Sequence, residues 1–136
     1  MDISIEANQN IDLINRVFGE MASQSTQVGS ILVNETLIST LVTDDACFLV
    51  CSIDTIDISE KDVLLHCLDI NSTLAFESRG SICFDSESKT LHYVSKIDMD
   101  SPQMHGNDFE SKVNLFKETH SWICDVIALG QVKLSI

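Results

Sequence analysis

The sequence is poor in basic residues, and it lacks long apolar runs. It has 8 lysines and arginines against 21 aspartates and glutamates in 136 residues, so its formal net charge is −13 at pH 7. A surface this acidic repels polyanions, which makes nucleic acid and anionic membrane poor candidates for a partner. No apolar run approaches the roughly 20 residues that a membrane-spanning helix needs. We therefore expect neither nucleic-acid binding nor membrane insertion.

Secretory and disulfide signals are also missing. The opening stretch MDISIEANQNIDLI has no basic start, apolar stretch or small-residue cleavage site, so we expect a cytoplasmic protein. The five cysteines are odd in number and show no C-x-x-C spacing. We interpret them as reduced core residues. The alternative is a metal site, in which Cys47 and Cys51 on one side of a strand would join one of His66, His92, His105 or His120.

Motifs that carry catalysis are absent as well. The five glycines stand apart, so no phosphate-binding loop is present, and neither H-E-x-x-H nor G-x-S-x-G occurs. The aspartates near the predicted strand ends do not have EF-hand spacing. His120 lies on an apolar helical stripe, where a histidine at the edge of the core is expected. We therefore expect no catalytic residue, no cofactor and no metal.

The first half of the chain shows one helical pattern followed by three strand patterns. After a loose leader over 1–8, apolar residues recur at helical spacing over about 9–23. Three β-rich runs follow, and the breaks Asn34-Glu35 and Asp44-Asp45 are short enough for hairpins. The sequence thus predicts an antiparallel meander over Ser30–Val33, Leu37–Thr43 and Cys47–Ile53. These runs are apolar on both faces, so either helices cover both faces or one face receives a partner.

The second half predicts a helix, a hairpin and a further helix. Ser59 and Asp62 approximate a capping box for a helix over about 59–76 that is apolar on two sides. Strands over 81–85 and 90–97 flank the polar turn SESK. The last helix is expected from Asp108 to Leu129, with Gly130 as its C′ residue. The order α-β-β-β-α-β-β-α predicts one α+β domain over residues 1–136, with an antiparallel twisted sheet and flanking helices.

This element order, with the stretches that carry it, resembles the class I chaperones of bacterial type III secretion, of the Tir-chaperone type. IDLINRVFGEMA resembles their opening helix, SILVNETLISTLVTDDACFLVCSID their meander and FESKVNLFKETHSWICDVIALG their closing helix. Leu65, Leu68, Asn71 and Gly80 match the family's LxxLNxxxxxxxxG rhythm. The resemblance covers about residues 9–130. Two departures are the short link SQSTQVGS and the polar pair Ser72-Thr73, where the family tends to have apolar residues.

The resemblance implies a homodimer in the bacterial cytoplasm that binds an extended segment near the N-terminus of an effector protein. Such chaperones need no ATP and keep the effector secretion-competent. The effector segment would add along an exposed strand edge, and the second helix would pack on its dimer mate. The effector-binding residues expected on this basis are Ile14, Val17, Phe18, Met21, Leu32, Val33, Leu41 and Val50. Those expected at the dimer seam are Leu64, Leu65, Cys67, Leu68 and Phe84.

Two alternatives stay open. A dimeric protein-interaction adaptor unrelated to secretion would also self-associate, but it would bind a folded partner. A small-molecule-binding or enzymatic α+β domain would need a deep pocket with convergent polar groups. The sequence offers no obvious set of such groups.

Overall fold

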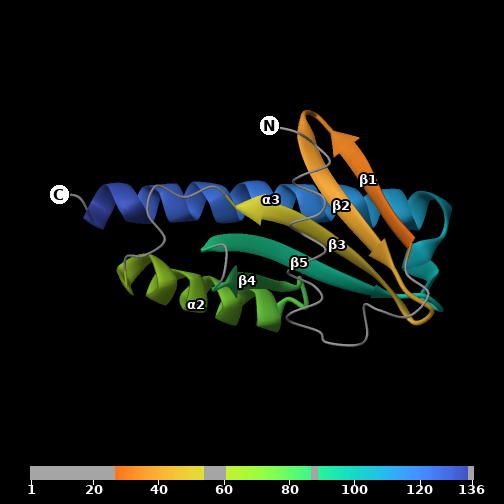
Figure 1. Ribbon diagram of the computed structural model, residues 1–136, viewed down its shortest axis with the longest axis horizontal. Coiled ribbons are helices and arrows are strands. Elements are labelled where there is room, and N and C mark those ends of the chain that lie inside the picture. The colour runs from red at the N-terminus through yellow and green to blue at the C-terminus, as the bar shows by residue number, and fades with distance from the viewer. Residues whose placement is uncertain (1–26, 54–60, 87–88, 135–136) are drawn as a thin grey trace.

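The computed structural model describes residues 27–53, 61–86 and 89–134, which form a five-stranded antiparallel sheet with two helices on one face (Figure 1). The strand order is β1-β2-β3-β5-β4. The strands are β1 (Gln27–Val33), β2 (Thr36–Val42), β3 (Ala46–Ile53), β4 (Ser81–Asp85) and β5 (Thr90–Asp98). The helices are α2 (Lys61–Phe76) and α3 (Gly106–Leu134), with a short 3-10 helix, η2 (Pro102–Met104), before α3. The predicted α+β class is confirmed, whereas the expected first helix over 9–23 lies outside the described residues.

The predicted meander is confirmed by the pairing of β1, β2 and β3. Val33 pairs with Thr36 across the first hairpin, and both turn residues have positive φ, 48° at Asn34 and 69° at Glu35. Two consecutive residues in the left-handed region form a type I′ turn, whose twist matches that of the flanking strands. This turn fixes the register of the edge strand β1 on β2.

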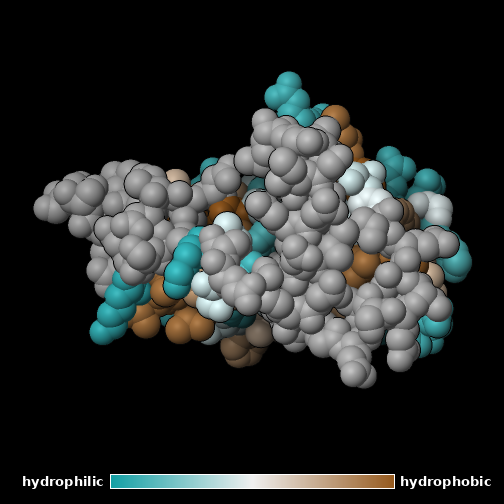
Figure 2. All heavy atoms as spheres, in the orientation of Figure 1, coloured by the Kyte–Doolittle hydropathy of each residue, from teal (hydrophilic) through white to brown (hydrophobic). Residues whose placement is uncertain are grey.

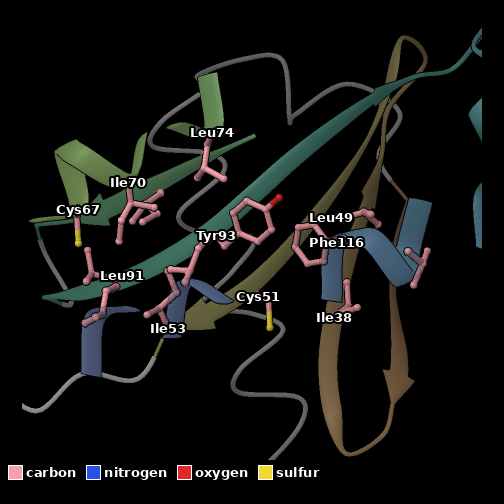
Figure 3. Close-up of a cluster of buried hydrophobic side chains, with 14 of the residues drawn as sticks. Ile38, Leu49, Cys51, Ile53, Cys67, Ile70, Leu74, Leu91, Tyr93 and Phe116 are labelled. Atoms are coloured by element: carbon pink, nitrogen blue, oxygen red, sulfur yellow. The ribbon is translucent and has the colours of Figure 1, made fainter. Parts of the chain in front are cut away.

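The main core lies between the sheet and the two helices (Figure 3). Val63, Cys67, Ile70 and Leu74 supply the α2 side, while β3 supplies alternate residues from Cys47 to Ile53. From α3, the Phe116 ring stacks on that of Tyr93 in β5, with 4.5 Å between centroids and 15° between planes. The Tyr93 hydroxyl donates a hydrogen bond to the carbonyl of Arg79, just beyond α2. One side chain thus ties β5 to both helical regions.

A second apolar cluster lies on the opposite face of the sheet. It consists of Leu41, Ala46, Phe48, Val50 and Val94, all buried. Along β3 these residues alternate with Cys47, Leu49 and Cys51 of the main core, as the two-residue period of a strand requires. The predicted apolar character on both faces is therefore confirmed. Neither α2 nor α3 contributes a residue to this second cluster.

Helix α2 ends in a Schellman motif with serine in the place of glycine. Ser78 has φ 53°, and the two bonds of the motif run from the Arg79 amide to the Leu74 carbonyl (2.9 Å) and from the Ser78 amide to the Ala75 carbonyl (3.2 Å). Gly80 follows with φ 95°, and a Cβ atom there would collide with the carbonyl of Val94. Glycine is therefore required at the point where the chain enters β4 against β5.

Helix α3 runs to Leu134, so the prediction that it ends at Leu129 with Gly130 as its C′ residue is wrong. Glycine inside a helix costs only about 1 kcal/mol relative to alanine, which neighbouring helical residues can offset. The helix also begins two residues before the predicted Asp108, at Gly106. Its C-terminal turns extend past the end of the sheet (Figure 1).

Candidate protein-binding surfaces

Helix α2 carries large apolar side chains on the side that faces away from the core. Leu68 is 62% exposed and Phe76 93% exposed, while Leu65 is about half exposed. In Figure 2, hydrophobic residues gather over α2 at the lower left. Leu65, Leu68 and Phe76 recur at spacings of three and eight residues, which keeps them on one stripe of a helix. We call this stripe, with Phe84 of β4, the α2 seam.

The residues predicted for the dimer interface fall into two groups. Leu65, Leu68 and Phe84 lie on the α2 seam, and Leu64 is partly buried beside the core. Cys67 is buried in the main core, where it supports the helix from behind. Phe76 belongs to the same exposed stripe and was not predicted. The helical spacing of Phe76 from Leu65 and Leu68 could have identified it from the sequence, although it is the last residue of the helix.

The two edge strands of the sheet, β4 and β1, differ in whether their outward backbone groups already have hydrogen-bond partners. At the β4 end, the Ile82 amide donates to Oδ1 of Asn71 (2.6 Å), and Nδ2 of Asn71 donates to the Ile82 carbonyl (3.1 Å). The Asn71 side chain thus pairs with β4 as a neighbouring strand would. Since these are groups that an added strand would need, the β4 edge is partly closed.

The β1 edge is open among the described residues, because no described strand pairs with its outer side. In an antiparallel hairpin closed by a two-residue turn, Val33 and Ile31 direct their backbone groups toward β2. Ser30 and Leu32 alternate with them and direct theirs outward. The Leu32 side chain is 64% exposed at the same place. The edge therefore offers backbone donors and acceptors beside an apolar side chain.

The residues predicted to bind an effector do not share one surface in the structure. Leu41 and Val50 are buried in the second cluster, and Val33 packs against the main core on the other face. Leu32 alternates with Val33 and so faces the side of the second cluster. Ile14, Val17, Phe18 and Met21 lie outside the described residues. Within the described part of this set, Leu32 has the largest exposed fraction.

The predicted position of His120 at the edge of the core is confirmed. This half-buried residue donates from Nε2 to the carbonyl of Ser52 at 2.7 Å, and so links α3 to β3. Its Nε2 lies 3.6 Å from Sγ of Cys124. Since Nε2 of His120 donates its hydrogen bond to the Ser52 carbonyl, it is not available as a base for the Cys124 thiol. His92, buried in β5, lies 2.8 Å from the Thr90 hydroxyl through its own Nε2.

Burial also shapes the chemistry of the thiols and of Tyr93. It raises the pKa of Cys47, Cys67 and Cys83, and the hydrogen bond between Ser81 and Cys83 opposes it only in part. Burial raises the pKa of Tyr93 to about 12, against the lowering effects of Thr119 and Arg79. These groups are thus neutral at physiological pH. In the described ranges, no group of three or more His, Cys, Asp or Glu residues could hold a metal ion.

Comparison with known proteins shows a likeness in fold. No family model matches the chain, and no curated protein matches its sequence. Its fold is similar to that of one chain in the heterodimeric complex ExoU-SpcU from the type III secretion system of Pseudomonas aeruginosa. The TM-score is 0.55 at 12% sequence identity, over 86% of this chain and 95% of that chain. The two chains share a fold, that of the secretion-chaperone-like α+β class predicted above.

None of the helices in the described ranges is both long enough and apolar enough to cross a lipid bilayer.

Proposed function

We propose that the protein is an ATP-independent chaperone that binds the N-terminal segment of a type III secretion effector in the bacterial cytoplasm. The observation that carries this proposal is the agreement of two likenesses. The sequence resembles class I secretion chaperones in element order and in the rhythm from Leu65 to Gly80. The fold is similar to a chain of a complex that comes from a type III secretion system.

The effector segment pairs as an added strand with the outer side of β1. Two features support this edge over the other. Ser30 and Leu32 direct backbone groups outward, and the Leu32 side chain is exposed beside them. At the opposite edge, Asn71 already bonds the Ile82 backbone. Backbone pairing gives affinity that tolerates many sequences, and Leu32 selects for apolar side chains at alternate positions.

The remaining members of the predicted binding set support this contact in different ways. Leu41 and Val50 are buried and Val33 is partly buried against the main core, so they hold β1, β2 and β3 in place behind the edge. Ile14, Val17, Phe18 and Met21 keep the role that the sequence resemblance implies, as apolar contacts of the same effector segment. The net charge of −13 keeps the chain soluble between rounds of binding.

Two copies associate through the α2 seam. Leu65, Leu68, Phe76 and Phe84 form its exposed part, with Leu64 at its margin and Cys67 behind it. Apolar side chains of this size, gathered on one helix, favour burial against a second copy. An isologous contact of this kind places α2 against α2 around a two-fold axis.

The proposal is tested by capturing the partner and then measuring whether its N-terminal segment alone binds. A tagged chain is purified from the native bacterium without added nucleotide, and the co-eluting proteins are identified by mass spectrometry. We expect one stoichiometric partner whose N-terminal segment, unfolded alone, binds the chain in the absence of ATP. Binding that needs a folded domain of the partner would instead favour the adaptor alternative. Ser30→Pro should remove an outward donor of β1 and weaken the complex, while the matched Ser30→Ala keeps it.

A further inference from the structure

Helix α3 presents a second exposed surface, separate from the α2 seam. Leu115, Trp122 and Leu129 recur at intervals of seven residues and are exposed at 36%, 41% and 62%. Residues seven apart lie nearly above one another on an α-helix, so the three side chains form a line about 21 Å long. Glu118 and Asp125, both exposed, lie between them. We call these five residues the α3 ridge.

The side chains of the α3 ridge do not take part in packing α3 onto the sheet. The buried residues of this helix, among them Phe116 and Ile123, lie about a third of a turn away from Trp122. They hold the helix on the sheet, and the ridge residues remain open to solvent. Trp122 is the only tryptophan of the chain. In protein interfaces, tryptophan commonly contributes much of the free energy of association.

The charge on the ridge is of one sign. Glu118 and Asp125 have no ion-pair partner among the residues that the structure describes. Between Val113 and Leu129 the one lysine or arginine is Lys117, which lies about 140° around the helix from Trp122. From Leu115 to Leu129 an apolar residue is thus followed by an acid twice, and neither acid is neutralised by an ion pair within the described ranges.

This charge argues against a second copy of the chain as the occupant. If two α3 helices packed antiparallel with Trp122 against Trp122, Glu118 of one copy would lie beside Asp125 of the other, at both ends of the contact. Parallel packing would place identical acids together. Like charges directly across a seam destabilise it.

We propose that the α3 ridge docks a basic amphipathic helix of a protein partner. Apolar residues of that helix at heptad spacing pack on Leu115, Trp122 and Leu129. Lysine or arginine residues that flank its apolar row pair with Glu118 and Asp125, as charged positions beside an apolar seam do in helix pairs. This partner goes beyond the extended effector segment of the proposed function, because it binds as a helix and on a different element.

The test uses the full chain and designed peptides, with Trp122 as the reporter. The basic peptide has three heptads, with leucine at positions a and d and lysine at e and g, and its control has glutamate at e and g. Because the chain has one tryptophan, docking on the ridge shifts the emission of Trp122 to shorter wavelength. We expect saturable binding of the basic peptide that weakens with salt, and at least tenfold weaker binding of the acidic one.

Two double charge-reversal variants test whether the basic peptide binds through the acids of the α3 ridge or only through general electrostatic attraction to an acidic protein. Glu118→Lys with Asp125→Lys should weaken binding of the basic peptide at least tenfold. The matched control, Asp100→Lys with Glu110→Lys, changes the net charge equally at exposed residues off the ridge, and should stay within twofold. Circular dichroism checks that both variants fold. Equal weakening by both variants, equal binding of both peptides, or no shift of Trp122 emission would each overturn the proposal.

Discussion

Leu68 and Leu74 lie on the same helix and differ almost completely in burial, at 62% and 0% exposed. Leu74→Ala removes buried atoms between α2 and the sheet and leaves a cavity. Such changes lower the free energy of unfolding by about 2–5 kcal/mol. In a dilute monomer, Leu68→Ala removes atoms that face solvent, so we expect a change within about 0.5 kcal/mol.

The same Leu68→Ala change should weaken a dimer that uses the α2 seam. Full burial of a leucine side chain contributes about 1.5–3 kcal/mol, so covering its exposed part contributes about 1–2 kcal/mol. A two-fold dimer contains the contact twice, and alanine keeps a small share of it. The expected loss is about 2–3 kcal/mol of association free energy, which raises the dimer dissociation constant roughly 30- to 150-fold.

Urea denaturation at low protein concentration and sedimentation equilibrium at rising concentration measure the two effects separately. The matched control is Asp69→Ala, next to Leu68 and exposed. Equal destabilisation of the dilute monomer by Leu68→Ala and Leu74→Ala would refute the reasoning from burial. A dissociation constant unchanged by Leu68→Ala would place the dimer contact elsewhere.

Three further predictions concern the fold. Asn71→Ala should lower unfolding stability by about 1–3 kcal/mol in urea denaturation, because it leaves the buried backbone of Ile82 without its partners; a loss below 0.5 kcal/mol would contradict this. Gly80→Ala should cost more than Gly106→Ala by thermal unfolding, since both glycines have positive φ but only at Gly80 would the new Cβ collide with backbone. Tyr93 has a pKa of about 12 in the folded chain against about 10 unfolded, so its contribution is complete below pH 10 and is lost between pH 10 and 12. Tyr93→Phe should flatten the loss of stability in that range, and an unchanged pH profile would speak against the burial of the hydroxyl.

Helix ends show where the sequence could and could not predict the fold. The spacing of apolar residues located α2 and α3, but both C-terminal ends depend on single residues. α2 stops at a Schellman motif with Ser78 in the left-handed region, whereas α3 continues through Gly130. Glycine favours a stop because its φ is unrestricted, but the packing of neighbouring residues decides whether the stop is used.

The candidate surfaces were predictable to different degrees. Leucines on two sides of α2 correctly indicated an exposed stripe, because the core needs only one side of a helix. Leu41 and Val50 were expected at a contact, but they are buried. Strand alternation shows which face a residue takes and does not show what covers that face. The hydrogen bonds by which Asn71 closes part of the β4 edge could not be predicted from the sequence, since they depend on the position of β4 in the sheet.

Amide hydrogen exchange on the complex with the captured effector tests the central claim most directly. The account predicts new protection at Ser30 and Leu32 on the outer edge of β1, together with protection of an N-terminal effector segment that exchanges freely when alone. Protection confined to a folded domain of the partner, with the β1 edge unchanged, would contradict the claim that this chain holds an extended effector segment by strand addition.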